Sequence, residues 1–424
     1  MVFAACTPFG CGRDGGTSST FAADESDAAL TSAPLALCGA PSDTWERREP
    51  SALGLDPARL QAAFDWANQH TGLSVAVYRH GCLAAESRLD EITRNEPLDG
   101  WSMTKSVTSM IVGRAVTLGA FNIDEPIARL VPEADARHGA LTPRQLLTMT
   151  SGLHANYARD FLAPLPDRVC DALALPFDYE PGAVWQYAQT TLDLLLHVLE
   201  RAIGADVQEF AQAELFGPVG IPAGSWTWDR DPDGHTNAWA HLKMPNGHWA
   251  RLGQLMLQGG RWNGRLLLSP AYVREALTPV PDNPAYGLLF WRNGGEWWRV
   301  PDVEGPDDGV GRLIPSGPKD MFMMVGLGEQ RTFIIPSRDL VIVRLGERGS
   351  HEADTRVALW SDRAGEIDHE IVRRVLLAVT DVPYDDPGPY HSAGVILPPP
   401  DQGLIADAQD VGFVVDGMTT PACH

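Results

Sequence analysis

The sequence contains very little lysine. Only Lys105, Lys243 and Lys319 occur among 33 basic residues, so arginine supplies nearly all of the positive charge. Acidic residues are more numerous, at 55, and the formal net charge is −22. A surface this acidic repels nucleic-acid phosphates and anionic membranes, so neither is expected as a partner. The scarcity of lysine also makes a lysine inside a chemical motif easier to interpret.

A long apolar run is missing as well. A membrane-spanning helix needs about 20 consecutive apolar residues, and no segment comes near that length, so no membrane span is expected. The opening Met1–Cys6 resembles the end of a bacterial lipoprotein signal, in which a cysteine becomes lipidated. The apolar stretch of a secretory signal is absent or cut short there, and a leader without targeting value is an equal alternative. A secreted, periplasmic or lipid-anchored location is favoured over the cytoplasm.

Three sequence signatures are also missing. The absence of a Cys-x-x-Cys pair disfavours a zinc or redox site built on cysteine. The absence of Gly-x-Ser-x-Gly and His-Glu-x-x-His disfavours an α/β-hydrolase and a zincin. We therefore expect no metal and no organic cofactor. An even number of cysteines permits disulfides in an oxidising compartment, but the sequence leaves the pairing open among Cys6, Cys11, Cys38, Cys82, Cys170 and Cys423.

The length of 424 residues and the 44% apolar content are those of a globular chain with a sizeable core. Residues 1–50 are rich in Gly, Ser, Thr, Ala and Asp and are predicted to be a leader or linker without fixed structure. Residues 51–385 are expected to form the catalytic domain, with a helical subdomain at about 95–282. Residues 386–424 contain several prolines and are predicted to be an extended tail. The sequence sets no oligomeric state.

The hydrophobic periodicity of residues 51–385 predicts strands at both ends and helices between them. A helix is expected over 56–68, with Asp56 as its N-cap, and a hairpin follows with its turn at His80–Gly81. This order implies an α+β fold, in which an antiparallel sheet flanked by helices meets an inserted, mainly helical domain at a cleft. The later strands are predicted at 286–292, 321–325, 330–335 and 340–345, and a closing helix at 366–380.

The segment Trp101–Ser106 opens a predicted helix that runs to Leu118 and stops at Gly119. Small or apolar residues cover most of its circumference, so the helix is expected to be buried. Residues three apart lie on one face of a helix, which places the Lys105 amine within reach of the Ser102 hydroxyl. A serine needs an adjacent base to become nucleophilic, and burial lowers the pKa of a lysine. Ser102 is therefore predicted as the nucleophile and Lys105 as its general base.

This pattern is weak when it stands alone, and an isolated Ser-x-x-Lys is structural more often than catalytic. The chain contains a second one, Ser316–Lys319, in which glycine and proline preclude a regular helical turn. Other elements are therefore needed to support the catalytic interpretation.

Tyr187-Ala-Gln189 follows a Glu-Pro-Gly turn and precedes a helix that is predicted to begin with a capping pattern of Thr190 and Asp193. A tyrosine at such a position can direct its hydroxyl into a cleft. Near the Lys105 ammonium its pKa would fall, and it could carry a proton to the leaving group. The alternative is a packing residue whose hydroxyl is satisfied.

Gly326–Gln330 precedes a strongly β-prone segment. Glycines there let a substrate approach the strand edge, and the backbone N–H of Gln330 could join that of Ser102 in an oxyanion hole. Gly328 and Glu329 would then lie beside the substrate. A tight turn between strands is the alternative.

Together these elements resemble the class C beta-lactamase-like superfamily, which includes penicillin-binding proteins, esterases and 6-aminohexanoate-oligomer hydrolases. Ser102–Lys105 matches its Ser-x-x-Lys motif, Tyr187–Gln189 stands where the family has Tyr-x-Asn, and the likeness covers about residues 53–380. It implies an acyl-enzyme mechanism without a cofactor. Ser102 would be the nucleophile, Lys105 the base and Tyr187 a proton carrier, and the N–H groups of Ser102 and Gln330 would hold the oxyanion.

Two departures from the family pattern bear on the substrate. True beta-lactamases carry a Lys-Thr-Gly motif whose cation binds the antibiotic carboxylate, whereas Leu327–Glu329 offers no cation, so efficient penicillin hydrolysis is not expected. Gln189 replaces the usual asparagine and lengthens the reach of its amide. Three further candidates for substrate contact are Trp185, Trp291 and His154, for each of which ordinary packing or a loop position is the alternative.

The sequence therefore predicts a serine hydrolase that acts on a small ester or amide. The same residues would serve a D-amino-acid peptidase or a weak beta-lactamase, with Arg331 as a substitute cation. A non-catalytic cell-wall or peptide-binding protein of the same fold is a rival of another class. The presence of Ser102, Lys105 and Tyr187 disfavours that rival.

Overall fold

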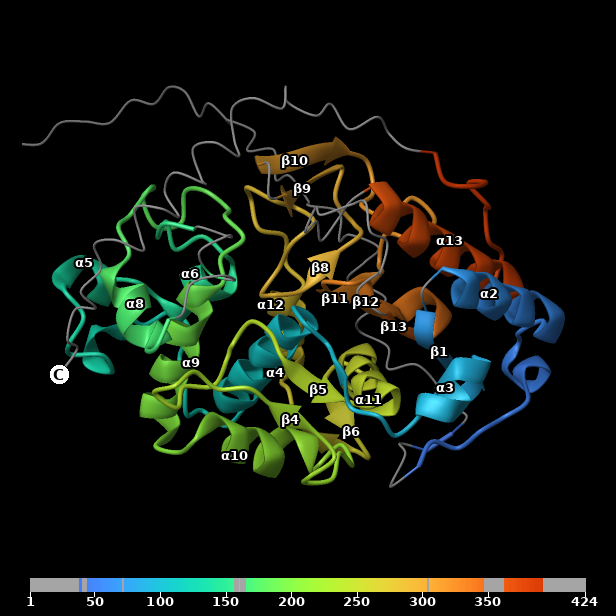
Figure 1. Cartoon of the computed structure of the whole chain (residues 1–424), viewed down its shortest axis with the longest axis horizontal. Coiled ribbons are helices and arrows are strands. Elements are labelled where there is room, and N and C mark those ends of the chain that lie inside the picture. Colours follow the sequence, from blue (N-terminus) through green and yellow to red (C-terminus); the bar gives the residue numbers. More distant parts are fainter. Residues whose placement is uncertain are drawn as a thin grey trace, which may run out of the picture.

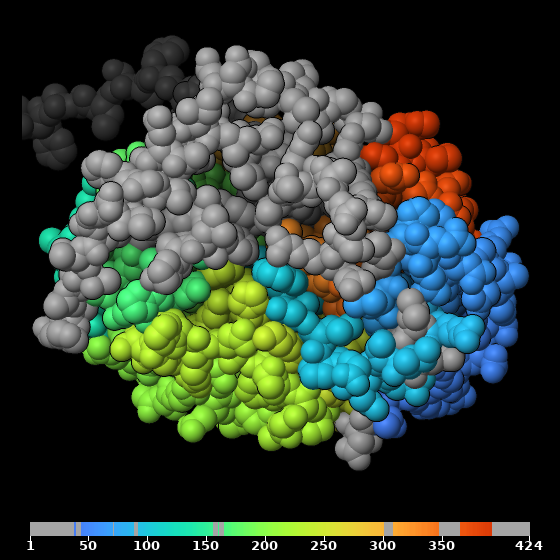
Figure 2. Space-filling model, viewed as in Figure 1, coloured from blue at the N-terminus to red at the C-terminus, as the bar shows by residue number. Residues whose placement is uncertain are grey.

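The computed structural model describes residues 38–39, 44–70, 72–155, 160, 165–302, 305–346 and 362–391. Two parts pack together: a sheet with the first and last long helices, and a mainly helical part formed by the middle of the chain (Figure 1). On the face drawn in Figure 2 they form one continuous body, with the helical part in green and yellow. The expected α+β fold is confirmed.

The sheet has six antiparallel strands in the order β2-β1-β13-β12-β11-β8. Its central pair joins the two ends of the domain, because β1 pairs with β13 from Ser74 opposite Leu345 to Arg79 opposite Leu340. The helical part is thus an insertion into a sheet made from distant segments, as predicted. The strands are β1 Gly72–Arg79, β2 Cys82–Glu86, β8 Trp291–Arg292, β11 Phe322–Gly326, β12 Gln330–Ile335 and β13 Leu340–Gly346.

Most of the predicted strands are confirmed within one or two residues. The first hairpin turns at His80 and Gly81, whose φ angles of 54° and 74° suit a two-residue turn. The strand predicted over 286–292 is wrong except for its last two residues. Leu289 has a φ of 60°, and a Cβ on Gly287 would lie 2.2 Å from the carbonyl oxygen of Ala276. The chain therefore bends tightly against a helix instead of extending.

Helices cover both faces of the sheet, and β12 shows which helix lies on which face, because successive residues of a strand point to opposite sides. Arg331 donates to Asp368 of α13. Thr332, the next residue, contacts Gly253 of α11 and Met103 of α4. Helix α2 lies beside α13 (Figure 1). These helices are α2 Pro57–Gln69, α4 Met103–Thr117, α11 Asn246–Leu257 and α13 Asp362–Ala378.

The helix that begins after Ser102 lies at the centre of the helical part. Every residue of α4 from Met103 to Ala115 is buried, and Gly119 follows it with a φ of 72°, as the sequence predicts. The other helices are α3 Arg88–Thr93, α5 Ala136–Gly139, α6 Pro143–Leu147, α8 Arg168–Ala174, α9 Thr190–Ile203, α10 Val207–Ala211 and α12 Pro270–Ala276. Short strands that the sequence pattern did not predict are β3 Leu98–Asp99, β4 Thr227–Trp228, β5 Leu242–Met244, β6 Arg261–Trp262, β7 Arg265–Leu266, β9 Trp297–Asp302 and β10 Gly305–Val310.

Part of the predicted leader contacts the domain. A disulfide joins Cys38 to Cys82, and the Trp45 ring lies 4.4 Å from the Tyr78 ring, centroid to centroid. Met1–Cys6, the rest of residues 1–37, and the tail beyond residue 391 lie outside the described residues, so the domain limits stay predictions. Among the helices that the structure describes, none has both the length and the apolar character of a membrane span.

Candidate active site

Ser102 and Lys105 are in direct contact at the start of α4. The Lys105 Nζ lies 2.9 Å from Ser102 Oγ and donates a 3.0 Å hydrogen bond to the carbonyl oxygen of Trp239. Ser102 is 4% exposed and Lys105 1% exposed. The three-residue spacing thus places the two side chains in contact, as predicted. The Lys105 amine is close enough to accept the proton of the Ser102 hydroxyl.

The turn that presents Ser102 is strained and well supported. Trp101 has a φ of 47°, in the left-handed region, where a non-glycine residue costs about 1–2 kcal/mol. Asp99 holds the turn with both carboxylate oxygens, because it accepts from the Trp101 N–H at 2.7 Å and bonds to His241 Nδ1 at 2.8 Å. The His241 ring in turn lies 4.8 Å from the Trp101 ring. Such strain persists where neighbouring contacts hold it, and it is typical of functional sites.

Burial changes the protonation of Lys105. It lowers the pKa of the Lys105 amine well below its usual value, and the negative charges of Asp193 and Asp160 oppose that shift. A neutral amine is the form that can accept a proton from serine. The surroundings of Lys105 therefore favour the base that the mechanism needs.

Asp193 and Trp239 belong to this environment, although the sequence analysis assigned neither a role in it. Asp193 accepts hydrogen bonds from the Ala238 N–H at 2.8 Å and from Trp239 Nε1 at 3.2 Å. Burial raises the pKa of the Asp193 carboxyl to about 7, and the Arg168 guanidinium, 3.9 Å away, acts in the opposite direction. Asp193 thus fixes the segment whose carbonyl oxygen binds Lys105.

The predicted capping pattern at the start of α9 is wrong. Gln189 is the N-cap residue and makes no side-chain cap. The Thr190 hydroxyl donates to Asp160 at 2.7 Å, and Asp193 serves the segment around Trp239. The Asp160 carboxylate thus takes the Thr190 hydroxyl, and the N–H groups of Ala238 and Trp239 take the Asp193 carboxylate.

Tyr187 lies beside the same amine. Lys105 Nζ is 4.7 Å from the centroid of the Tyr187 ring. The Tyr187 hydroxyl is buried and meets no partner at hydrogen-bonding geometry among the described residues. Burial raises the pKa of Tyr187, and the nearby Ser102 hydroxyl and Arg331 charge only partly oppose this. The expectation that an ammonium lowers this pKa is wrong, and Tyr187 is a neutral phenol at neutral pH.

Aromatic rings surround Tyr187. The rings of Trp185, Tyr286 and Trp291 lie 6.1, 6.4 and 6.0 Å from the Tyr187 ring. The structure thus brings two predicted substrate contacts, Trp185 and Trp291, next to Tyr187. It adds Tyr286, which the sequence analysis placed only at the start of a predicted strand.

Buried polar atoms without partners gather in the segment that carries Tyr187. The Trp185 Nε1 atom and both polar atoms of the Gln189 amide are buried and lack a hydrogen bond among the described residues. An unsatisfied buried polar group destabilises a fold by about 1–3 kcal/mol, so native proteins rarely keep one without a function. A bound substrate could satisfy such groups. Gln189 makes no bond to Lys105 within the described contacts, and its role stays a prediction.

A model of the beta-lactamase family matches residues 58–365. The chain belongs to the beta-lactamase family. Esterase EstB of Burkholderia gladioli is 29% identical over 211 residues, which are 41% of this chain and 53% of the esterase. The ML-236A carboxylate methylbutanoyltransferase mlcH of Penicillium citrinum is 30% identical over 177 residues, 34% of this chain and 41% of the transferase. The chain thus spans about half the length of these curated relatives.

The fold of this beta-lactamase family member also matches solved structures. A penicillin-binding protein homologue from Caulobacter crescentus has a TM-score of 0.54 at 17% identity, and the match covers 76% of this chain and 99% of that one. The resemblance that the motifs indicated is therefore confirmed at the level of the family and the fold. Of the two curated relatives, one is named an esterase and the other a methylbutanoyltransferase.

The β11–β12 hairpin reaches the nucleophile turn in this family member. A Cβ on Gly326 would lie 2.1 Å from the carbonyl oxygen of Gly100, so the end of β11 touches the backbone just before Ser102. Gln330 stands opposite Gly326 in the hairpin, and its side-chain amide donates to Gly346 at 2.7 Å and to Gly328 at 3.0 Å. The backbone role of Gln330 in an oxyanion hole stays a prediction.

Charged residues near this hairpin are directed to other partners. The Glu329 carboxylate pairs with the buried Arg344 guanidinium at 2.7 Å, so its charge is compensated rather than presented alone to a substrate. Arg331 binds Asp368 at 2.8 Å on the α13 side of the sheet, the face opposite α4. The idea that Arg331 replaces the missing lysine of a beta-lactamase is therefore wrong. His154 Nδ1 bonds to Asp178 at 2.9 Å, and its contact with substrate stays a prediction.

Proposed function

We propose that this chain is a serine hydrolase that cleaves small carboxylic esters or amides through an acyl-enzyme on Ser102. The contact between Lys105 Nζ and Ser102 Oγ at 2.9 Å carries the proposal, because it joins a nucleophile to a base whose pKa is lowered by burial. The membership of the beta-lactamase family and the esterase relative support the same reaction class.

In the first step the Ser102 hydroxyl gives its proton to the neutral Lys105 amine while its oxygen attacks the substrate carbonyl carbon. The leaving group then needs a proton. Tyr187 is a neutral phenol next to Lys105 and Ser102, so it can donate its own proton to the leaving oxygen or nitrogen and recover one from Lys105. The balance is an acyl-serine and a released alcohol or amine.

The oxyanion of the tetrahedral intermediate would be held by backbone N–H groups. Ser102 stands at the start of α4, where the helix dipole is positive. Gln330 would supply the second donor from the β12 side. Each preorganised donor of this kind typically stabilises the transition state by about 3 kcal/mol.

The acyl group is proposed to lie against the rings around Tyr187. Trp185, Tyr286 and Trp291 are uncharged and lie buried against one another beside Tyr187. A neutral, apolar acyl chain fits this lining better than a carboxylate-bearing antibiotic. This favours an ester or amide hydrolase over the beta-lactamase and D-amino-acid peptidase alternatives.

Transfer of the acyl group to an alcohol is the second candidate function. The relative mlcH is named a methylbutanoyltransferase, and transfer differs from hydrolysis only in which hydroxyl attacks the acyl-serine. Adding a primary alcohol to the hydrolysis assay separates the two, because a transferase forms the new ester in preference to the free acid.

We also propose a location outside the cytoplasm. The Cys38–Cys82 disulfide supports it, because such bonds persist in oxidising compartments and are rare in reducing ones. Finding the pair reduced in protein isolated from its native host would contradict this location.

Hydrolysis of short-chain p-nitrophenyl esters tests the function. The wild-type chain should turn over, and Ser102→Ala should lose activity while keeping its melting temperature. Ser106→Ala is the matched control, because Ser106 lies on the same buried helix but donates to the Leu289 carbonyl oxygen at 2.7 Å. Equal activity of wild type and Ser102→Ala would contradict the assignment of the nucleophile. Rapid hydrolysis of a chromogenic cephalosporin would favour the beta-lactamase alternative instead.

A further inference from the structure

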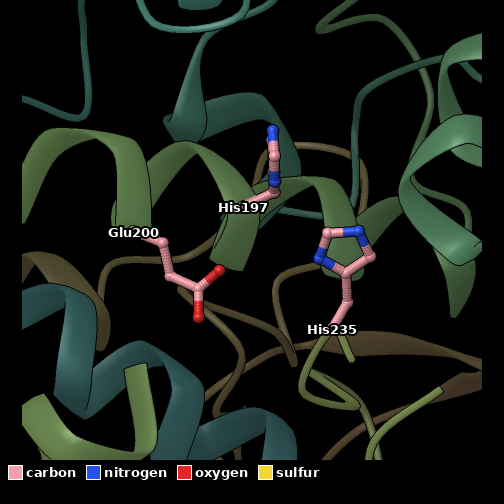
Figure 3. A group of neighbouring side chains, drawn as sticks. All are labelled: His197, Glu200 and His235. Atoms are coloured by element: carbon pink, nitrogen blue, oxygen red, sulfur yellow. The ribbon is translucent and has the colours of Figure 1, made fainter. Parts of the chain in front are cut away.

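Two histidines and a glutamate converge away from Ser102 and Lys105. His197 and Glu200 lie three residues apart on one face of α9, and His235 comes from the loop between β4 and β5 (Figure 3). One potential ligand atom from each residue lies within 4.8 Å of the other two. The two imidazole rings are 5.4 Å apart between centroids and nearly perpendicular, at 86°. The proposed hydrolysis uses none of these side chains.

Carboxylates approach both imidazoles from outside the group at ion-pair distance. The Nε2 atom of His197 lies 3.5 Å from Glu133. The Nε2 atom of His235 lies 3.4 Å from Asp233 and 3.7 Å from Asp167. These are ion-pair distances, and the His197 Nε2 makes no hydrogen bond among the described residues; each Nε2 faces a carboxylate outside the group, which leaves Nδ1 as the nitrogen nearer the other two side chains (Figure 3). A metal-binding histidine usually has its second nitrogen on a carboxylate or carbonyl in this way, which fixes the tautomer and makes the ring a better ligand.

Glu200 is oriented in a similar manner. Its Oε1 accepts the Val207 N–H at 3.0 Å, which leaves Oε2 as the second oxygen of the carboxylate. All three side chains are partly exposed, and they line a surface pocket together with Arg201 and Asp206. A hydrated ion could therefore enter. The Arg201 guanidinium is engaged with Glu133 at 3.0 Å.

We infer that His197, Glu200 and His235 form a zinc-binding site. Two imidazole nitrogens and one carboxylate oxygen are a ligand set that zinc prefers, and a water molecule would complete a tetrahedron. Zinc–ligand distances of about 2.0–2.1 Å place tetrahedral ligands about 3.4 Å apart. The ligand atoms would have to approach by up to about 1.4 Å from their 4.8 Å limit, which rotation about the side-chain bonds can supply.

The zinc would clamp a loop to α9. His235 lies four residues before Trp239, whose carbonyl oxygen binds Lys105. Within the same loop, the Asp231 carboxylate accepts a hydrogen bond from the His235 N–H at 2.8 Å. Helix α9 begins shortly after Tyr187. The ion would thus brace two segments that reach the active site, and its role is stability rather than chemistry.

A second arrangement shares His235. Asp167 and Asp233 approach the other face of this residue, and one ligand atom from each of the three lies within 4.8 Å of the others. In that arrangement the ion would bind His235 Nε2 and two carboxylates. Zinc favours the set with two imidazoles over the one with a single imidazole, so the first arrangement is the one proposed.

Metal binding by the full chain tests the proposal. Tag-free protein, freed of metal with a chelator, is titrated with zinc against a chromophoric competitor, and cobalt is used in parallel for its visible absorption bands. We expect one zinc that raises the melting temperature by a few degrees. The variants Glu200→Gln and His197→Gln should weaken zinc binding at least about 100-fold. Glutamine at position 200 can still accept the Val207 N–H, so the fold is expected to survive.

Two further variants separate the possible outcomes. His248→Gln is the matched control, because His248 bonds to Ser225 at 3.0 Å outside the group, and it should bind zinc as the wild type does. Asp233→Asn should change the affinity far less than Glu200→Gln. The reverse order would overturn the proposed ligand set in favour of the second arrangement. Failure of the wild type to bind zinc or cobalt, or equal binding by Glu200→Gln, would overturn the site itself.

Discussion

The carbonyl oxygen of Trp239 accepts a 3.0 Å hydrogen bond from Lys105 Nζ across 134 residues of sequence. When the amine is neutral, it donates to this oxygen and directs its lone pair elsewhere. Ser102 Oγ, 2.9 Å from Nζ, is the polar group in line to give its proton to that lone pair. Trp239 therefore positions the base, and the nucleophile depends on a segment that follows α9.

Lys105→Ala should reduce kcat for ester hydrolysis by about 10²–10⁴-fold, the range typical of a lost general base. Lys243→Ala is the matched control, since Lys243 forms a partly exposed ion pair with Asp229 at 3.0 Å. Steady-state kinetics of both variants check this. A Lys105→Ala enzyme with at least one tenth of wild-type activity would contradict the role of the base.

The acidic limb of the pH–rate profile should follow Lys105. Activity requires the neutral amine, so it falls as the pH drops below the pKa of Lys105. Asp193 raises that pKa, and removing its charge in Asp193→Asn should move the limb to lower pH. Asp160→Asn should move it in the same direction by less. A profile that moves to higher pH in Asp193→Asn would contradict this electrostatic assignment.

Tyr187→Phe should lower activity without lowering stability. The Tyr187 hydroxyl meets no partner at full hydrogen-bonding geometry among the described residues and lies near the Ser102 hydroxyl, so its removal should break no structural hydrogen bond. Tyr272→Phe is the contrasting variant, because its hydroxyl donates to the Ser109 carbonyl oxygen at 2.8 Å, and its loss should destabilise the fold. Kinetics together with denaturant unfolding measure both effects. A clear destabilisation by Tyr187→Phe would show that the hydroxyl has a structural partner.

The disulfide should contribute to stability. Cys38 and Cys82 are 44 residues apart. Closing a loop of that length lowers the conformational entropy of the unfolded chain, which stabilises the native state by about 4 kcal/mol in the entropic treatment. The double variant Cys38→Ser with Cys82→Ser should therefore unfold at a lower urea concentration than the oxidised wild type. Identical midpoints would show that the bond adds nothing to the native state.

The sequence predicted those parts of the site that local spacing controls. Ser102 and Lys105 lie on one turn of one helix, so their contact follows from helix geometry. The strands β12 and β13 are short apolar runs with a clear turn between them, so the sequence pattern predicted their bounds. Trp239 and Asp160 could not be found in this way, because they come to Lys105 from segments whose approach depends on the tertiary fold.

Local rules failed where buried charge competes with them. Thr190 and Asp193 have the spacing of a capping pair, but Lys105 lies close by and both side chains bond within the buried network. The sequence analysis considered Arg331 as a substitute cation. Its place in β12 fixes its direction, because the pleat sends it to Asp368 and away from α4.

The most direct test of the central claim is to trap the acyl-enzyme and locate it. Wild-type protein is mixed with a p-nitrophenyl ester, quenched in acid during turnover, digested and analysed by peptide mass spectrometry. We predict an acyl group on the peptide that contains Ser102, on that serine and not on Ser106, and none in Ser102→Ala. An adduct on another residue, or turnover by Ser102→Ala at the wild-type rate, would contradict the assignment of Ser102 as the nucleophile.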